Sequence, residues 1–240
     1  MRAYVLAGGL GTRLRDRLGT LPKILAPFGE RTFLDEQLEW LAGCGVNEVT
    51  LALGVRSDPV IDRVRVRSAD AIPLVRWTVD PLPLGTGGAL GLATRDETRT
   101  YLAVNGDTLA EIDLVALLER HRAGGALVTL ALYKVSDASG RGLVEAEEDG
   151  RVTAFREKAR GGEAWVSGGI YFCEPGLRDF VPRGKPSGLE TDVFPELLAA
   201  HLPVYALRVK GRMFDIGTPA GLDEAQREWP KVRDRGKERA

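Results

Sequence analysis

A glycine-rich loop near the start of the chain is well suited to hold an anion. The apolar run Ala3–Leu6 predicts a buried strand, and the loop from Gly8 to Arg13 (GGLGTR) follows it. Glycines let backbone N–H groups close on phosphate oxygens, and Arg13 adds a planar fork of donors. The dinucleotide fingerprint would need glycine where Leu14 stands, and the Walker pattern would need a terminal Gly-Lys-Ser/Thr. A plain tight turn is the alternative.

Two carboxylates stand where a metal ion could be held. Asp107 follows the apolar run Tyr101–Val104, and open α/β sheets bind ligands at the carboxyl ends of their strands. A carboxylate there can hold Mg²⁺ while phosphates and water complete the octahedron, although a strand-ending turn is the plainer interpretation. Asp215 lies in an apolar run and needs a cation or donors. The two are 108 positions apart, so spacing does not demonstrate that they meet.

Side chains for nucleophilic catalysis form no recognisable set. His121 and His201 fall near predicted helix ends, where a structural role beside the helix dipole explains them. Cys44 and Cys173 indicate no disulfide framework, which favours a reducing compartment. A reaction through this chain is therefore expected to rely on charge and positioning.

Composition excludes several classes of partner. The 240 residues carry 33 Lys and Arg against 34 Asp and Glu, a net charge of −1, so no global field attracts nucleic acid or an anionic membrane. No apolar stretch reaches 18 residues. We expect a cytoplasmic protein with one domain over residues 1–230, followed by a charged tail, 231–240, that frays.

The first half of the chain alternates strand and helix patterns. Continuous apolar runs predict buried parallel strands, and i, i+4, i+7 spacing of leucines predicts a helix. The predicted strands are 3–6, 49–53, 74–79 and 101–104, and the predicted helices are 33–44, 58–67, 87–93 and one capped by Asp113. This βαβ rhythm predicts a Rossmann-like, doubly wound, mostly parallel α/β sheet, with a nucleotide-binding half at about residues 1–122.

The second half, about residues 123–230, reads differently. Strand patterns at 126–133, 143–147, 152–156 and 165–172 have no helix between them, which indicates mixed or antiparallel additions. Asp149-Gly150 predicts a type I′ hairpin turn. We expect a helix at about 192–201, short strands at 204–207 and 213–216, and a last helix that Thr218 and Pro219 begin.

Six ordered motifs give the chain a family resemblance. The loop GGLGTRL is followed by Pro22-Lys23, and the remaining motifs are Pro83–Ala89, Asn105–Asp107, Phe155–Lys158, Ser167–Tyr171 and Asp215–Pro219. In this order they resemble the sugar-1-phosphate nucleotidylyltransferases, and most of all the short D-glycero-D-manno-heptose 1-phosphate guanylyltransferases. The resemblance implies the nucleotide-diphospho-sugar transferase fold and a nucleoside triphosphate and a sugar 1-phosphate as substrates. It also implies Mg²⁺ held by Asp107 and Asp215, and it allows a homo-oligomer.

The resemblance places the nucleotide in the first half. Arg13, Lys23 and Asp107 would be catalytic. The nucleotide-binding residues would be Leu6, Ala7, Gly8, Gly9, Gly11, Thr12, Asp80, Gly85, Thr86 and Gly87. Asp80 favours GTP, because a carboxylate can accept hydrogen bonds from N1–H and the exocyclic amine of guanine. Enzymes of the family that use pyrimidines often carry glutamine near here. A surface aspartate, and a UTP- or dTTP-dependent enzyme acting on N-acetylmuramic acid or glucose 1-phosphate, are the alternatives.

The resemblance places the sugar phosphate in the second half. The implied residues are Asn105, Gly142, Glu157, Lys158, Gly168, Gly169 and Glu190. Plainer interpretations are a surface charge pair for Glu157-Lys158 and a β-bulge for the two glycines. Arg141 stands where the family has tyrosine, so we expect it to change the shape of the sugar pocket.

The implied reaction needs no general base, because a sugar 1-phosphate is already an anionic nucleophile. Its oxygen would attack the α-phosphorus of the triphosphate and expel pyrophosphate. A glycosyltransferase of similar fold is one rival, but it normally carries Asp-x-Asp where this chain has Asn105-Gly106-Asp107. A non-catalytic nucleotide-sugar sensor is another, and the intact charged residues argue against it.

Overall fold

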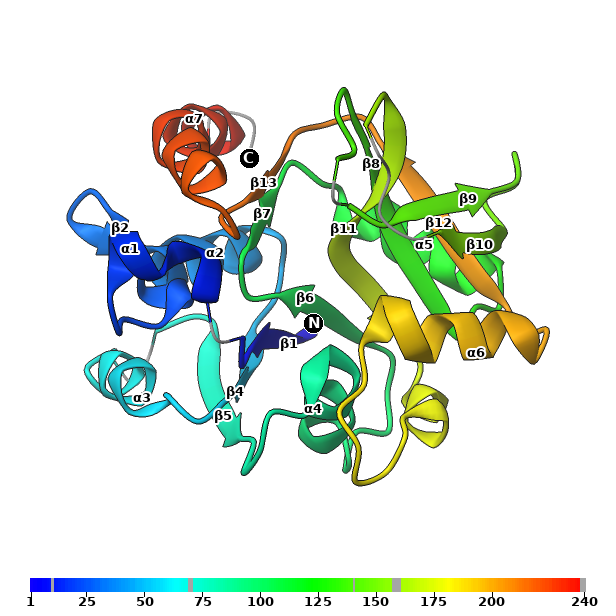
Figure 1. The fold of residues 1–240 in the computed structure, drawn as a ribbon, viewed down its shortest axis with the longest axis horizontal. Coiled ribbons are helices and arrows are strands. Elements are labelled where there is room, and N and C mark those ends of the chain that lie inside the picture. Colours follow the sequence, from blue (N-terminus) through cyan, green and yellow to red (C-terminus); the bar gives the residue numbers. More distant parts are fainter. Residues whose placement is uncertain (10, 69–70, 140, 157–160, 238–240) are drawn as a thin grey trace.

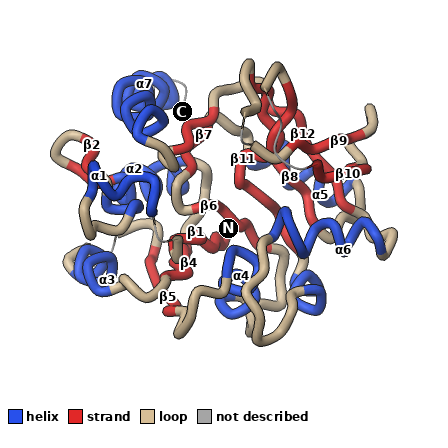
Figure 2. The backbone as a smooth tube through the Cα atoms, viewed as in Figure 1, coloured by secondary structure: helices blue, strands red, loops and turns tan. Residues whose placement is uncertain are grey.

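The computed structural model describes residues 1–9, 11–68, 71–139, 141–156 and 161–237. Over these ranges a central sheet has helices on both sides, seen as a band of strands between helices in Figures 1 and 2. The strands of the main sheet are β1 (Arg2–Ala7), β4 (Glu48–Leu53), β5 (Leu74–Val79), β6 (Tyr101–Asn105), β8 (Val128–Val135), β9 (Leu143–Ala146), β10 (Val152–Arg156), β11 (Ala164–Cys173) and β12 (Val204–Val209).

Short ribbons and helices complete the description. Two ribbons lie apart from the main sheet: β2 (Pro27–Phe28) with β3 (Arg31–Thr32), and β7 (Thr108–Ala110) with β13 (Met213–Asp215). The α-helices are α1 (Arg15–Leu18), α2 (Phe33–Gly43), α3 (Asp58–Arg65), α4 (Gly85–Ala93), α5 (Leu114–Ala123), α6 (Phe194–Ala199) and α7 (Pro219–Lys237). Shorter helical turns are η1 (Thr12–Leu14), η2 (Lys23–Leu25), η3 (Pro175–Phe180) and the π-helical η4 (Leu189–Val193). None of the described helices combines the length and apolar character that crossing a membrane requires.

The order of the strands confirms a mixed α/β fold with a mostly parallel centre. Strands β5, β4, β1 and β6 lie side by side and run parallel. Beyond β6, β11 runs antiparallel to both β6 and β8, and β9 and β10 form an antiparallel hairpin. The antiparallel additions therefore begin where the predicted helices between strands stop.

From Ala3 to Ala7, strand β1 carries no charged residue because it is covered on both faces. Ala3 and Val5 belong to the same apolar cluster as buried side chains of α2, α3, α5 and α7, whereas Tyr4 and Leu6 belong to the cluster on the other face, with side chains of α4 and α6. Successive residues of a strand point to opposite faces, so a strand covered on both sides needs no polar alternation. Strand β1 is thus a central strand of the sheet, between β4 and β6, and the glycine loop starts at its carboxyl end.

The hairpin between β9 and β10 is present, but the predicted type I′ turn is wrong. That turn needs positive φ at two residues, and at Asp149-Gly150 only Gly150 has it, with φ 85°. The Glu147 N–H donates to the Arg151 carbonyl at 2.9 Å, so the loop contains three residues and not two. The helix expected from residue 192 is also shifted, since it begins with the π-helical turn η4.

The C-terminal helix runs further than the sequence indicated. We expected residues from 231 onward to fray, but α7 continues to Lys237, and Val232 is buried. Residues 238–240 lie outside the described ranges. In Figure 1, α7 lies over the N-terminal elements α1 and α2, at the other end of the sequence.

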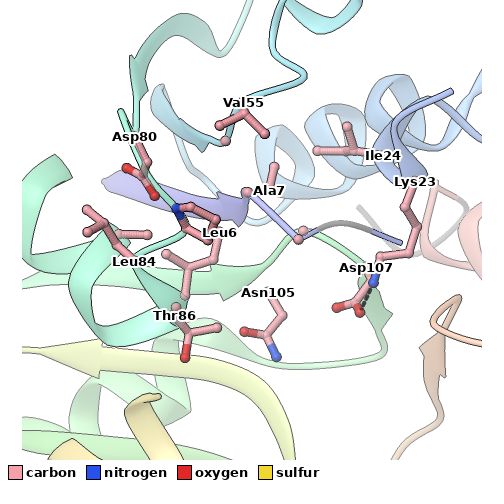
Figure 3. Close-up of a pocket in the computed structure, with 17 residues that line it drawn as sticks. Leu6, Ala7, Lys23, Ile24, Val55, Asp80, Leu84, Thr86, Asn105 and Asp107 are labelled. Carbon is pink, nitrogen blue, oxygen red and sulfur yellow. Dashed lines mark hydrogen bonds and ion pairs between the residues drawn. The ribbon is translucent and has the colours of Figure 1, made fainter. Parts of the chain in front are cut away.

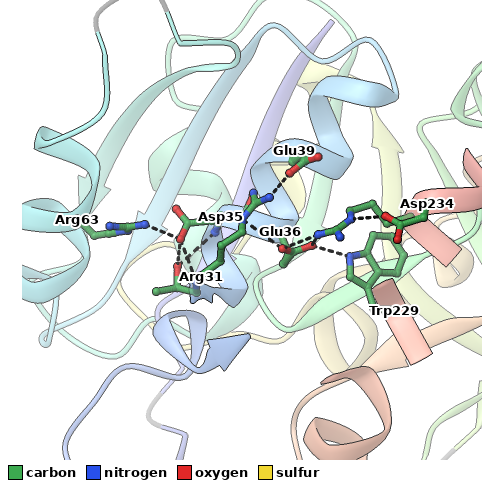
Figure 4. A network of polar contacts seen from close by, with 9 residues as sticks. Arg31, Asp35, Glu36, Glu39, Arg63, Trp229 and Asp234 are labelled. Atoms are coloured by element: carbon green, nitrogen blue, oxygen red, sulfur yellow. Dashed lines mark hydrogen bonds and ion pairs between the residues drawn. The ribbon is translucent and has the colours of Figure 1, made fainter. Parts of the chain in front are cut away.

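Glu36 holds α7 against α2. Its side chain is only 3% exposed and accepts a hydrogen bond from the Trp229 indole at 3.1 Å. Arg233 donates to both of its oxygens at 3.0 Å, and Arg31 lies 3.2 Å from one of them (Figure 4). A buried carboxylate needs such partners, so the end of α7 is fixed by charge as well as by apolar contact.

Replacing Glu36 by glutamine should therefore destabilise the protein. We expect a loss of about 2 kcal/mol in the free energy of unfolding, because Arg233 and Arg31 would be left facing a neutral amide. Urea unfolding of the two proteins measures this difference. Asp223→Asn is the matched control, because Asp223 also ties α7 to the N-terminal segment, through Arg17, but in an exposed pair. Equal losses in the two variants would contradict the assigned role of Glu36.

Candidate active site

A cavity of about 290 Å³ opens at the carboxyl ends of β1, β4, β5 and β6. Ligands of open α/β sheets bind at this edge. Its lining consists of Leu6, Ala7, Gly8, Gly9, Lys23, Ile24, Gly54, Val55, Asp80, Pro83, Leu84, Gly85, Thr86, Ala89, Asn105, Gly106 and Asp107. In Figure 3, Asp80 lies at one end of the cavity and the Lys23–Asp107 pair at the other. A long ligand with one polar end and one anionic end fits this arrangement.

Glycines allow the strand ends to approach one another at the cavity floor. A Cβ on Gly54 would lie 2.7 Å from the Gly8 carbonyl oxygen, and one on Gly106 would lie 2.7 Å from that of Leu6. Real Cβ atoms do not approach so closely, so larger residues would push the loops apart. Backbone therefore forms the floor of the cavity, as a site that holds phosphate groups requires.

Lys23 and Asp107 form an ion pair at the end of the cavity opposite Asp80 (Figure 3). Lys23 begins the short helix η2, and Asp107 follows β6 after one glycine. Both side chains are mostly shielded, with 18% and 23% of their surface exposed. The pair places one cation and one carboxylate where phosphate oxygens and a metal ion could share them.

Asp215 reaches the same end of the cavity through the β7–β13 ribbon. Asp215 pairs with Thr108 across the ribbon, and the Ile216 N–H donates to the Asp107 carbonyl oxygen at 3.0 Å. A Cβ on Gly217 would lie 2.8 Å from Asp215 Oδ1 and 3.6 Å from Asp107 Oδ2. The two carboxylates that sequence spacing could not join are thus neighbours in the fold.

Arg13 belongs to the same cluster. It lies in η1, directly after the glycine loop, and its Nη2 is 3.6 Å from the position that a Cβ on Gly217 would take. Arg13, Lys23, Asp107 and Asp215 therefore converge from four separate segments. Cations and carboxylates in this mixture suit a group that carries several phosphates together with a divalent ion.

Asp80 is the unusual group at the other end. It is 3% exposed, and its Oδ1 has no hydrogen-bond partner among the described residues. Burial raises the pKa of the Asp80 carboxyl to about 6. A buried acceptor without a partner is costly to the fold, so the alternative of a surface aspartate is wrong. The group is poised to accept hydrogen bonds from a ligand in the cavity.

Several of the predicted nucleotide-binding residues lie elsewhere. Gly87 turns toward Ser187, whose carbonyl oxygen accepts from the Gly87 N–H at 2.8 Å. Gly11 has φ 61° and serves as the N-cap of η1, and Thr12 begins that turn. These three residues do not belong to the cavity lining, although Gly85 and Thr86 do.

The predicted sugar side is built around a bulge in β11. The pairing register of β11 with β8 shifts between Ser167 and Tyr171, and the two predicted glycines, Gly168 and Gly169, lie within this stretch. A Cβ on Gly169 would lie 2.4 Å from Asn105 Nδ2. The Tyr171 hydroxyl donates to Glu190 Oε1 at 2.6 Å, so that oxygen already has a protein partner.

Three more sugar-side predictions were made, and only one of them falls on a described residue. Gly142 lies just before β9, outside the cavity lining. Leu143, directly after Gly142, pairs with Val166 of β11. Glu157 and Lys158 lie outside the described residues.

Some lining residues were missed by the sequence reasoning. Gly54 and Val55 follow β4 as Gly8 follows β1, so a glycine directly after an apolar run was a usable signal. Ile24, Leu84 and Ala89 line the cavity with ordinary apolar side chains, which carry no local signal of function.

His121 has the structural role expected of it. It lies in the last turn of α5, with one ring nitrogen 3.0 Å from the Thr129 hydroxyl and the other 3.1 Å from a Glu174 carboxylate oxygen. Burial lowers its pKa. It is not among the residues that line the cavity.

Sequence comparison places the chain among nucleotidyl transferases. The family model described as "Nucleotidyl transferase" matches residues 2–231. The mannose-1-phosphate guanylyltransferase of Mycobacterium tuberculosis is 34% identical over 90% of this chain and 61% of that protein. Mannose-1-phosphate guanylyltransferase 1 of Arabidopsis thaliana is 32% identical over 91% of this chain and 62% of that protein. The chain thus spans about three fifths of the length of these relatives.

Structural comparison agrees. The crystal structure of HddC from Yersinia pseudotuberculosis superposes with a TM-score of 0.84 at 27% identity, covering 95% of this chain and 99% of that one. The same protein complexed with GMP-PN gives a TM-score of 0.83 at 28% identity, with the same coverage. The match of the family model over almost the whole sequence, on a fold and a cavity of this kind, means that the chain belongs to the nucleotidyl transferase family.

Proposed function

We propose that this protein is a sugar-1-phosphate guanylyltransferase, which joins GTP and a sugar 1-phosphate into a GDP-sugar and releases pyrophosphate. The observation that carries the proposal is the buried, unpartnered oxygen of Asp80 at the end of the cavity opposite the Lys23–Asp107 pair. The guanylyltransferase names of the relatives and the GMP-PN complex of HddC support the same base.

The cavity suggests how GTP would lie. With the base at Asp80, the triphosphate would extend along the glycine loop toward Lys23 and Arg13. Backbone amides and these two cations would stabilise the charge that develops when the sugar phosphate oxygen attacks the α-phosphorus in line and pyrophosphate leaves. No proton has to be removed from the nucleophile, which agrees with the structural role of His121.

Asp107 and Asp215 fit a magnesium ion. They are hard oxygen donors held side by side by the β7–β13 ribbon, and Mg²⁺ is commonly bound by one or two carboxylates together with substrate phosphates. Among the described residues no group of three or more metal-ligating side chains occurs, so this site would be completed by phosphate and water. The ion would supply charge neutralisation at the reacting phosphates.

The sugar is proposed to be a mannose or heptose 1-phosphate. The names of the curated relatives support mannose 1-phosphate, and the motifs of the sequence favour a heptose. A screen of five nucleoside triphosphates against a panel of sugar 1-phosphates, read by pyrophosphate release, tests base and sugar together. Binding without turnover would point to a sensor, and consumption of a GDP-sugar without pyrophosphate would point to a glycosyltransferase.

Removing either phosphate-binding cation should slow the reaction. We expect Arg13→Ala and Lys23→Ala each to lower kcat for pyrophosphate release by about 10²- to 10³-fold, because a preorganised charge at the transferring phosphate is lost. Arg17→Ala is the matched control, since Arg17 follows in the same segment but pairs with Asp223 at the surface. Wild-type rates in the Arg13 and Lys23 variants would overturn the assigned roles.

Removing a proposed metal ligand should change the magnesium requirement. Activity should vanish with a chelator and return with Mg²⁺, and Asp215→Asn should need at least about ten-fold more Mg²⁺ for half-maximal rate. Asp113→Asn is the control, because Asp113 caps α5 away from the cavity and asparagine caps helices equally well. An unchanged Mg²⁺ titration of Asp215→Asn would exclude Asp215 as a ligand.

Asp80 should decide the base. In Asp80→Asn the amide NH₂ would face the donor groups of guanine, so we expect kcat/KM for GTP to fall by about ten- to hundred-fold while that for UTP falls less or rises. Asp96→Asn, at an exposed aspartate, should change neither value. Equal losses with GTP and UTP would contradict base recognition by Asp80.

The same residue should impose a pH dependence on GTP binding. Only the ionised carboxylate can accept on both oxygens from N1–H and the exocyclic amine together, and the raised pKa of about 6 means that Asp80 protonates as the pH falls through that value. The Kd for GTP should therefore rise below pH 6, by up to about ten-fold per unit. Asp80→Asn measured over the same range corrects for titration of the nucleotide itself, and the ratio of the two Kd values is the readout.

A further inference from the structure

Arg141, from the second half of the chain, lies beside Asp215, one of the two neighbouring carboxylates. It lies in the loop before β9, where its N–H donates to the Ala138 carbonyl at 2.9 Å. Its Nη2 is 3.9 Å from Asp215 Oδ2, and its side chain is 38% exposed. Its charge also contributes to lowering the pKa of Asp137. The guanidinium therefore lies beside Asp215, at the end of the cavity where Asp107 and Asp215 are neighbours.

A structural ion pair is a poor explanation for this position. At 3.9 Å the contact exceeds normal hydrogen-bond length, and pairs with this much solvent exposure contribute little to stability. A guanidinium has five N–H donors in a rigid fork that matches phosphate geometry. Toward the side chains that the structure describes, most of that donor capacity is therefore available for a ligand beside Asp215.

Charge balance identifies the ligand. The two proposed substrates bring several negative charges into one cavity. The described cations at the site, Arg13 and Lys23, both come from the nucleotide-binding half, and Lys158, which the resemblance assigns to the sugar phosphate, lies outside the described residues. The nucleophilic phosphate has to approach the α-phosphorus from the sugar side while lying close to the proposed metal ligands Asp107 and Asp215. Arg141 comes from that side and already lies beside Asp215.

Resting on the proposed function, we propose that Arg141 binds the phosphate group of the sugar 1-phosphate and orients it for attack. In the family pattern this position is a neutral tyrosine, so the chain carries an extra cation here. Arg141 then determines the affinity for the phosphate group of the sugar 1-phosphate more than it selects the shape of the sugar ring.

Steady-state kinetics of pyrophosphate release tests this assignment, with the best sugar 1-phosphate of the wild-type screen as substrate. We expect Arg141→Met to raise KM for the sugar 1-phosphate by about ten-fold or more while KM for GTP stays within about two-fold. Arg141→Lys should restore part of the loss, because the charge returns without the fork. Lys134→Met is the matched control, since it removes a cation of the second half that pairs with Glu163 at the surface, and both KM values should be unchanged.

The outcomes separate the two proposals. If the wild-type protein produces no pyrophosphate with any sugar 1-phosphate, the proposed function fails. If the wild-type protein turns over and Arg141→Met keeps the wild-type KM for the sugar 1-phosphate, only the role of Arg141 fails. A larger rise in KM for GTP than for the sugar 1-phosphate would also overturn it, because Arg141 would then contact the triphosphate.

Discussion

The pairing of β7 with β13 is the constraint on which the candidate site depends. It joins two segments that are 108 positions apart and places Asp215 beside Asp107, with a hydrogen bond from Ile216 to the Asp107 carbonyl. The ribbon also turns the chain back toward its N-terminal half, and α7 packs there immediately after it. The contact between α7 and α2 at Glu36 therefore helps to hold the second carboxylate in place.

Two neighbouring carboxylates repel each other, and the surrounding cations offset that repulsion. Lys23 pairs with Asp107, Arg141 lies near Asp215, and Arg13 reaches the same point from the glycine loop. Such an arrangement of alternating charges can bind phosphates and a divalent ion, because each bound group has a side chain of opposite charge already in position. The cleft is preorganised by ion pairs and not by a buried nucleophile, which is consistent with a reaction between two anions.

Local patterns in the sequence predicted the strands that end at the cavity, because a strand covered on both faces is apolar throughout and a glycine after it marks the loop. Features that depend on contacts between distant parts of the sequence could not be predicted from local patterns. The proximity of Asp107 and Asp215 comes from a ribbon of three-residue strands, too short for any period. The extension of α7 depends on a carboxylate 197 positions earlier, Glu36, which neutralises Arg233. Gly87, predicted to bind the nucleotide, faces Ser187 and lies outside the cavity lining, and sequence alone could not show this because a glycine looks the same whether a phosphate or a backbone approaches it.

Asp80 and Arg141 depart from what folding alone favours, and that departure is the argument for their function. An apolar side chain at position 80 would bury no polar atom, whereas the aspartate is buried with a raised pKa and with one oxygen that has no partner among the described residues. Arg141 is held by its backbone over a carboxylate that it does not fully engage. Among the described residues, Asp80 lacks donors and Arg141 lacks close acceptors, and the two lie on the base side and the sugar-phosphate side of the proposed reaction. In the proposed reaction guanine would supply the missing donors and the sugar phosphate would supply the missing acceptors, so specificity for both substrates would follow from the same principle of unsatisfied polar groups.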